Sequence, residues 1–309
     1  MSHRRIVRPR LALLAAMALL VAACGNGDGS GSTTTTTTTE SPTTTVPATT
    51  ITTTSLATTT TSATFGQVIY LLLDEVGGTT TGPFLVPVYR EGPLNGDEAS
   101  SAVELLLQGP TGDETAGIPA MHTAIPPGTT LLGLSVDDGV ATVDLSGEFD
   151  DGGGSAGMFA RLAQVVYTVT RVAGVDEVAF NLEGQPVDVF SSEGIELDRP
   201  QTRSDYYDWL PAVFVDSPAW AEPVTSPIEV KGLSNVFEAV SQIMLTDDDG
   251  LPLFEDTVMA SCGTGCWGDW SVSVPYEVDR DQVGALIVWE ISAKDGSRIN
   301  IREYPVLLR

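Results

Sequence analysis

The sequence predicts an α+β domain followed by an all-β sandwich, both behind an N-terminal export segment. A helix followed by two strands occurs twice, in residues 98–145 and 155–190, which favours a compact α+β domain over a parallel βαβ array. Short strands separated by turn residues fill 219–309. A basic and then apolar N-terminus, ending in small residues, precedes both regions.

The N-terminus indicates export with lipid attachment. Four arginines lie in residues 4–10, an uncharged apolar run covers 11–23, and the run ends in Ala22-Ala23-Cys24. Cys24 after small residues resembles the lipobox of bacterial lipoproteins, and the run is shorter than the roughly 20 residues of a spanning helix. We expect residues 1–23 to be a signal peptide. Diacylglycerol and an acyl chain such as palmitate on Cys24 then anchor the protein stably to the outer face of the cell membrane. An ordinary secretory signal with a stray cysteine is the alternative.

Composition and charge limit the function classes. The 309 residues include 15 basic and 41 acidic side chains, and removal of residues 1–23 leaves 11 basic ones and a net charge of −30. Such a charge disfavours nucleic acid and anionic lipid headgroups as partners. His3 leaves with the signal, so His122 is the single mature histidine and a His-rich metal site is excluded. We expect no cofactor.

Residues 24–64 are predicted to be a disordered tether. This segment consists mainly of threonine, glycine and serine with two prolines, and it has too little apolar content to offset the entropy of ordering. Fully extended, it reaches on the order of 100 Å. Whether its threonines carry O-linked sugars is left open by composition.

The first part of the α+β domain contains strands at 68–73 and 84–89, a helix at 98–108 and a hairpin at 131–145. Asp138-Gly139 suits a type I′ turn, in which Asp137 pairs with Val140. The alternation then predicts that six apolar residues share the inner face: Leu132, Leu134 and Val136 opposite Leu145, Val143 and Ala141.

A second helix and hairpin complete this domain. Ser155 is the expected N-cap after three glycines, and Gly174 is the expected stop. One core-facing stripe is predicted for the helix, formed by Phe159, Leu162, Val166 and Val169. Strands at 178–182 and 187–189 flank the turn at Glu183-Gly184.

Residues 206–217 are expected to connect the domains, with 218–309 forming the sandwich. Candidate strands are 228–230, 240–246, 253–259, 270–274, 285–292 and 299–308. This number of strands in about ninety residues is typical of an immunoglobulin-like sandwich. Cys262 and Cys266 are the only cysteines after Cys24, and export places them in an oxidising compartment, so we predict a disulfide between them. A zinc site needs a second ligand pair, which is absent from the sequence.

Five segments resemble the GerMN domain in the order of that family. They are 85–90, 105–111, 124–129, 140–146 and 164–168. The resemblance covers 66–205 and implies a fold similar to the ring-building modules of secretion-type assemblies. The C-terminal region resembles the immunoglobulin-like domain of bacterial spore germination, through residues 218–220, 226–227, 232–239 and 261–266. The pairing behind a lipobox resembles a group of actinobacterial lipoproteins. The resemblance to the GerMN domain implies no catalytic residues.

Three other sequence patterns suggest chemical sites. Residues 247–250 (Asp-Asp-Asp-Gly) do not match the register of an EF-type calcium loop and favour a turn. Residues 152–155 (Gly-Gly-Gly-Ser) precede a helix but lack the lysine of a phosphate-binding loop. The chain has no Gly-x-Ser-x-Gly elbow, and a serine or cysteine hydrolase needs a base that only His122 offers.

These observations predict a non-catalytic, surface-anchored lipoprotein that acts as a binding or assembly module in the cell envelope. Its partners are the membrane, through lipid on Cys24, and an envelope protein or cell-wall component whose identity the sequence does not give. Two alternatives stay open: a self-assembling ring or scaffold component, and a cell-wall enzyme that uses carboxylates. The relevance of germination and the oligomeric state also stay open.

Overall fold

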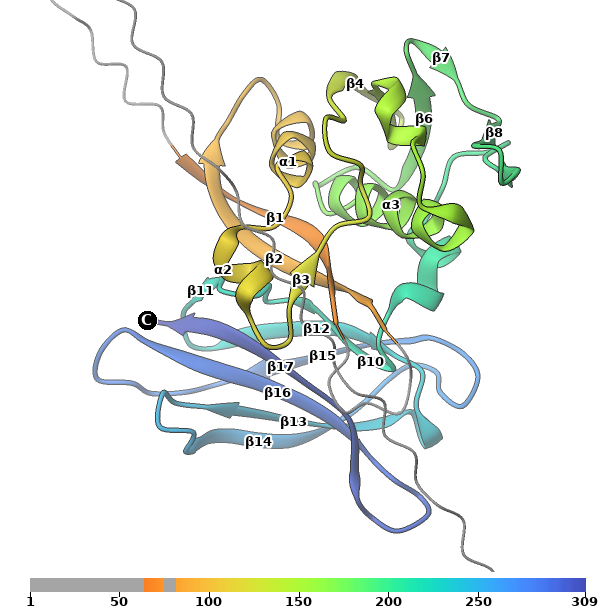
Figure 1. The fold of residues 1–309 in the computed structure, drawn as a ribbon. Helices are drawn as coiled ribbons and strands as arrows, with labels where there is room; N and C mark the ends of the chain where they lie inside the picture. The colour runs from red at the N-terminus through yellow and green to blue at the C-terminus, as the bar shows by residue number, and fades with distance from the viewer. Residues whose placement is uncertain (1–63, 75–81) are drawn as a thin grey trace, which may run out of the picture. The chain divides into compact units, whose positions relative to one another are not determined.

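The computed structural model describes residues 64–74 and 82–309, all of which belong to one compact unit. The predicted signal peptide, Cys24 and nearly all of the predicted tether lie outside the described residues. An α+β domain is followed by a mostly β domain (Figure 1), which confirms the predicted fold class. Within the described part of the chain, no helix has the length and apolar content needed to span a bilayer.

The first sheet of the α+β domain has the strand order β2-β1-β3 and is antiparallel. Its strands and the helices that follow β2 are β1 (Thr64–Leu73), β2 (Phe84–Pro93), α1 (Glu98–Leu107), α2 (Gly112–Ala116) and β3 (Met121–His122). Asp97 caps α1 by accepting a hydrogen bond from the Ser100 backbone N–H, and Thr111 forms a capping box with Glu114 at α2. The predicted strands and helix in this region are confirmed.

The second sheet has the order β4-β5-β6-β7, with β4 (Leu131–Asp137), β5 (Val140–Leu145), β6 (Glu177–Leu182) and β7 (Gln185–Pro186). The hairpin turn is confirmed, because Asp138 and Gly139 have φ of 48° and 84° and Asp137 pairs with Val140. Between β5 and β6 the pairing is parallel, and α3 (Gly154–Val169) forms the crossover, a detail that we did not expect.

The predicted register of the hairpin is wrong at its open end. A register shift between Leu131 and Gly133 places Leu131, and not Leu132, opposite Leu145. Leu132 and Val136 remain 50% and 47% exposed, while the β5 residues on the inner face are fully buried. The reason is that β4 is an edge strand, with a partner on one side only within the described sheet.

Helix α3 also differs from the prediction at its start. Gly153 is the N-cap, whereas Ser155 lies in the first turn and donates a hydrogen bond to Glu193. Phe159 is 41% exposed, although the other three residues of the predicted stripe are buried. The helix ends at Val169, and Gly174, with φ of 83°, lies in the turn beyond it. Short elements follow β5 and β7: η1 (Gly147–Asp150), β8 (Val189–Phe190), β9 (Ile195–Glu196) and η2 (Arg203–Trp209).

The β-sandwich consists of two sheets. One has the order β10-β12-β15, with β10 (Val213–Ser217), β12 (Ile228–Ser234) and β15 (Gly268–Val274). The other has the order β11-β17-β16-β13-β14, with β11 (Pro223–Val224), β13 (Val240–Thr246), β14 (Pro252–Met259), β16 (Gln282–Ile291) and β17 (Arg298–Leu308), and the short η3 (Phe237–Ala239) precedes β13. All six predicted strands are present. The structure also assigns the end of the predicted connector to the sandwich, because β10 pairs with β12.

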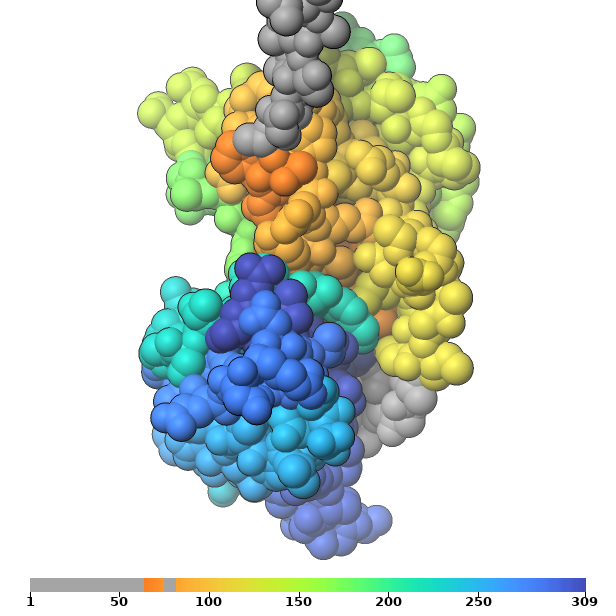
Figure 2. Space-filling model, turned by 90° about the vertical axis from the view of Figure 1, so that its left-hand side faces the viewer, coloured from red at the N-terminus to blue at the C-terminus, as the bar shows by residue number. Residues whose placement is uncertain are grey.

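The two domains share one continuous cluster of buried apolar side chains. The Tyr167 ring of α3 meets the Phe214 ring of β10 edge-on at 6.2 Å between centroids. Trp220 exchanges backbone hydrogen bonds with Pro87 and Tyr89 of β2, at 2.8 and 3.0 Å. In Figure 2 the sandwich, coloured teal to blue, abuts the α+β domain, coloured orange to green. The domains are therefore packed together and not merely joined by a linker.

Candidate functional site

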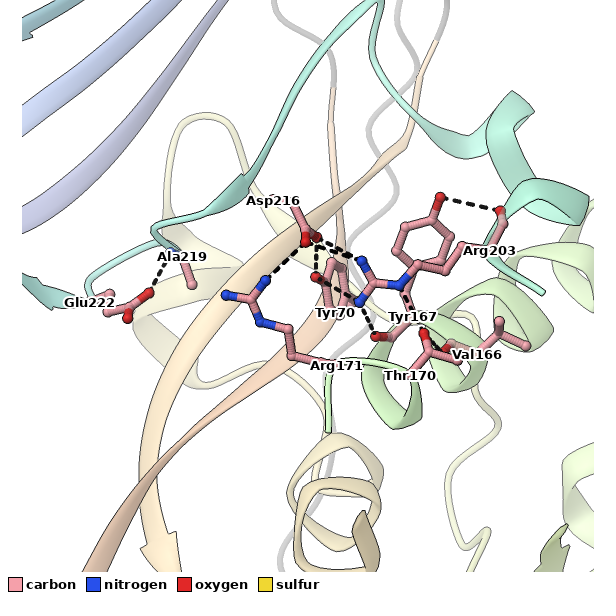
Figure 3. Close-up of polar contacts among 9 residues, drawn as sticks. All are labelled: Tyr70, Val166, Tyr167, Thr170, Arg171, Arg203, Asp216, Ala219 and Glu222. Atoms are coloured by element: carbon pink, nitrogen blue, oxygen red, sulfur yellow. Dashed lines mark hydrogen bonds and ion pairs between the residues drawn. The ribbon is translucent and has the colours of Figure 1, made fainter. Parts of the chain in front are cut away.

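A polar network at the domain junction centres on Asp216 of β10 (Figure 3). Its carboxylate accepts hydrogen bonds from Arg171 Nη1 at 2.9 Å and from Arg203 Nη1, at 3.1 Å to each oxygen. The Tyr70 hydroxyl of β1 donates to Asp216 Oδ1. One sandwich carboxylate thus binds three side chains that lie before β10 in the chain.

The position of Asp216 follows from a local irregularity of β10. Val213, Phe214 and Val215 are fully buried, as in a strand covered on both faces. The pairing with β12 then shifts between Val215 and Ser217, so that Asp216 is the extra residue of a bulge. A β-bulge redirects the side chain of the extra residue. This geometry explains how a carboxylate that directly follows a buried apolar run can face the α+β domain.

Arg203, at the start of η2, belongs to the network and also lies over the rings of Tyr70 and Tyr167. Its Nε donates to Thr170 Oγ1 at 2.8 Å, and its Nη2 donates to the Tyr167 carbonyl at 3.1 Å. The guanidinium carbon lies 4.8 Å from the Tyr167 ring centroid and 5.4 Å from that of Tyr70. Arginine is suited to this place because its planar head makes cation–π contacts and several hydrogen bonds at once.

The network contains two guanidinium groups that share one carboxylate. Burial by itself raises the pKa of the Asp216 carboxyl, but Arg203, Arg171 and the Tyr70 hydroxyl outweigh it and hold that pKa below its usual value. Burial also raises the pKa of the Tyr70 hydroxyl well above its usual range, so it stays a hydrogen-bond donor. Because Asp216 stays ionised and Tyr70 protonated, the arrangement suits a fixed electrostatic link between domains.

A second contact between the domains lies beside the cysteine pair. The structure joins Cys262 and Cys266, whose Cα atoms are 5.9 Å apart. The loop between them is held on the sandwich, because the Thr264 N–H donates to the Val236 carbonyl at 2.8 Å. Trp267, the next residue, packs on Tyr207 of η2 at 5.4 Å between ring centroids. The predicted disulfide therefore adjoins the domain junction, and its state in the exported protein stays a prediction.

The other residues singled out in the sequence lie apart from this network. His122 is on β3, where its Nδ1 lies 3.5 Å from Asp74 and its side chain is 41% exposed. Asp247 accepts hydrogen bonds from the backbone of Asp249 and Leu251, so this acidic segment forms a turn. In the part of the chain that the structure describes, no group of three His, Cys, Asp or Glu side chains is arranged to hold a metal ion.

The glycine-rich loop before α3 is occupied by an arginine of the same chain. The buried Arg161 donates hydrogen bonds to the carbonyl groups of Phe149, Asp151 and Gly152, at 2.5, 3.1 and 2.9 Å. Carbonyl oxygens of this loop thus point at a cation. The geometry favours a structural role for this glycine-rich loop over the anion-binding site that its glycines suggested.

Sequence reasoning missed Tyr70, Arg203 and Asp216 as partners. Tyr70 lies in the apolar run of β1, where it reads as a core residue. Arg203 lies inside a Thr-x-x-Asp pattern, which is a detectable capping box formed by Thr202 and Asp205 at η2. The signal that was available for Asp216 is a charged residue that directly follows the buried run of β10. Nothing in the sequence pairs these three positions, which are up to 146 residues apart.

Comparison with known families assigns both domains. Residues 68–188 match a family called Germane, described as sporulation and spore germination. Residues 212–297 match the immunoglobulin-like domain of bacterial spore germination. The chain joins a GerMN domain to an immunoglobulin-like germination domain. The predicted resemblance is thereby confirmed, and Asp216 links the GerMN domain to β10 of the immunoglobulin-like domain.

Several solved structures are distantly similar. The tandem GerMN domains of the sporulation protein GerM from Bacillus subtilis are 20% identical, with 46% of this chain and 47% of that chain covered and a TM-score of 0.38. The chain therefore spans about half of that structure. A Clostridium perfringens protein provisionally described as a lipoprotein is 21% identical, with 48% and 93% covered and a TM-score of 0.32. CopC from Methylosinus trichosporium OB3b is 19% identical, with 31% and 92% covered and a TM-score of 0.23. No curated protein matches the chain.

Proposed function

We propose that this chain is a lipid-anchored, non-catalytic protein of the cell envelope that uses its GerMN and immunoglobulin-like domains as one binding or assembly unit. The observation that carries the proposal is the junction network. The Asp216 carboxylate pairs with both Arg171 and Arg203 across the domain boundary. Ion pairs at the junction support a fixed placement of the two domains relative to each other. A partner that contacts both domains then meets a preorganised site.

The anchor is tested by the Cys24→Ser substitution. Lipid on Cys24 at the end of a long Thr-rich segment would hold the folded domains near the membrane while letting them reach into the cell wall. In its native host, we expect the wild-type protein to partition into detergent and the Cys24→Ser protein into the aqueous phase. Aqueous partitioning of the wild type would refute the anchor.

The partner is expected to be an envelope protein or a cell-wall component. Crosslinking in intact cells followed by pull-down of the wild-type protein identifies it, and the Cys24→Ser protein serves as the unanchored control. Incubation of the mature protein with purified peptidoglycan tests the non-catalytic part of the proposal. We expect no release of soluble fragments, and reproducible release would replace the proposal with the carboxylate-enzyme alternative.

Self-assembly is a second candidate, favoured by the exposed edge of β4. Leu132 and Val136 are about half exposed on this strand, and an edge that exposes apolar side chains can pair with another copy. If assembly uses this edge, the elution volume in size-exclusion chromatography will decrease with increasing concentration. The Val136→Lys substitution will then abolish this dependence. A single elution volume at all concentrations would eliminate this candidate.

A further inference from the structure

A pocket of about 460 Å³ lies where three elements of the α+β domain meet. It is bounded by the start of β2, the first turns of α3 and the end of η2, and its lining residues are Gly82, Pro83, Phe84, Ala156, Phe159, Asp205, Asp208 and Trp209. The pocket is separate from the Asp216 network, because none of its lining residues belongs to that network. Aromatic rings and carboxylates therefore share one cavity that the junction does not use.

The apolar wall of the pocket is exposed where a core position was expected. Phe159 lies on the predicted core stripe of α3 but is 41% exposed, and Trp209 is only half-buried. An exposed aromatic pair on a pocket wall offers flat apolar surface and a π face to a ligand. The ring of Phe84, which is 6% exposed, closes the pocket on the β2 side.

The two carboxylates of the pocket are in different electrostatic situations. Arg199 binds Asp205 with two hydrogen bonds, of 2.6 and 3.0 Å, and these bonds, with help from Thr202, lower the pKa of that carboxyl to about 2. The charge of Asp205 is thus already matched. Asp208 is exposed, and it has no hydrogen bond or ion pair with any residue that the structure describes. One unmatched negative charge therefore remains at the pocket.

We propose that this pocket receives a positively charged side chain, arginine above all, from a partner protein. The apolar stem of the side chain lies against Phe159 and Trp209, and its charge faces Asp208. A guanidinium suits both walls, since it stacks on aromatic rings and pairs with carboxylates. The mature chain, with a net charge of −30, attracts basic surfaces and repels acidic ones. This inference rests on the proposed function, because it names the chemistry of the partner.

The test is a titration of the full mature chain in detergent micelles with a short probe peptide. The probe is acetyl-Leu-Arg-Leu-amide, and its neutral match has citrulline, which keeps the shape of arginine without the charge. Binding is followed by the shift of the Trp209 indole ¹H–¹⁵N signal, which Trp209→Phe identifies. We expect the arginine peptide to bind on the order of two- to fivefold more tightly than the citrulline peptide, as for an exposed ion pair.

The variants Asp208→Asn and Asp281→Asn make the test specific. Asp281 is an exposed aspartate of the sandwich, away from the pocket lining, and it serves as the matched control. The preference for arginine should vanish in Asp208→Asn and persist in Asp281→Asn, which isolates the pairwise interaction. Equal binding of both peptides by the wild type, or a preference that survives in Asp208→Asn, would overturn the proposal.

A cell-wall ligand would give a different result. If a stem peptide with diaminopimelate shows an Asp208-dependent shift and the arginine peptide does not, the pocket recognises the cell wall and the proposal is wrong. Because the titration does not depend on the anchor, its failure is distinguishable from failure of the Cys24→Ser experiment.

Discussion

Removing the Asp216 carboxylate should destabilise the protein and uncouple its domains. In Asp216→Ala, Arg171 and Arg203 lose their shared anion and the Tyr70 hydroxyl loses its acceptor. Breaking a buried ion pair by removing one partner typically costs about 3–5 kcal/mol. The ion-paired side chains are 20–26% exposed, so water compensates part of this loss and we expect about 2–4 kcal/mol.

The assay is urea unfolding followed by tryptophan fluorescence and by circular dichroism. Coincident transitions from both probes indicate one cooperative unit, and we expect them for the wild type. For Asp216→Ala we expect a lower midpoint and two separated transitions, because the network joins β10 of one domain to β1 and η2 of the other. Asp248→Ala is the control, since its pair with Arg280 is on the surface, with side chains 33% and 62% exposed, and should contribute little to stability.

The Asp216 carboxylate should also make the free energy of unfolding depend on pH. The folded state holds the pKa of Asp216 below its value in the unfolded chain, which is about 3.9. Its stabilising contribution is therefore fully present above the unfolded pKa and is lost as pH falls through the folded pKa. The difference in unfolding free energy between wild type and Asp216→Asn should be constant between about pH 5 and pH 8 and should shrink below about pH 4. A difference that does not change down to pH 2, or Asp216→Ala effects no larger than those of Asp248→Ala, would refute this reasoning.

Three further predictions concern the cysteines, the second sheet and the histidine. Cys262 and Cys266 should be joined in freshly isolated protein, and replacing both by serine should cost about 1–2 kcal/mol; intact mass with and without reduction before alkylation checks the bond, and two free thiols would contradict it. Val143→Asp should unfold the α+β domain because Val143 is fully buried, whereas Leu134→Asp on the edge strand should cost less; thermal melting by circular dichroism separates the two. His122→Ala should leave melting and the cellular phenotype unchanged, and a lost phenotype with normal melting would indicate a functional role for this residue.

Local patterns predicted the elements better than the packing between them. The strands of the sandwich and the turn at Asp138-Gly139 follow from alternation and from positive φ, which act within a few residues. Leu132 and Phe159 were assigned to the core by the same periodicity, but they are exposed. Periodicity identifies a face of a strand or helix, and which part of that face is covered depends on neighbours from distant parts of the chain.

The candidate site was less predictable for the same reason. Cys262 and Cys266 are close in sequence, and redox compartment and spacing alone point to their pairing. Asp216 and Tyr70, 146 positions apart, come together only because β10 packs against the first sheet, where it contacts β2. A charged residue next to a run of buried apolar residues indicates one member of such a network, but it does not identify the partners. The bulge that orients the Asp216 side chain arises from the pairing of β10 with β12, and the sequence of β10 alone does not predict it.

Ion pairing of arginines within the protein affects how it can bind another copy of itself or a basic partner. Five arginines form ion pairs with acidic side chains within the described residues: Arg90, Arg171, Arg199, Arg203 and Arg280. Without the predicted signal peptide the chain has 11 basic and 41 acidic side chains, so most carboxylates have no basic partner and two copies repel each other. Salt screens this repulsion beyond about 10 Å at 0.1 M ionic strength. Pairing through the β4 edge should therefore strengthen with salt, whereas binding of a basic side chain beside Asp208 should weaken. The opposite salt responses separate the assembly candidate from the binding candidate.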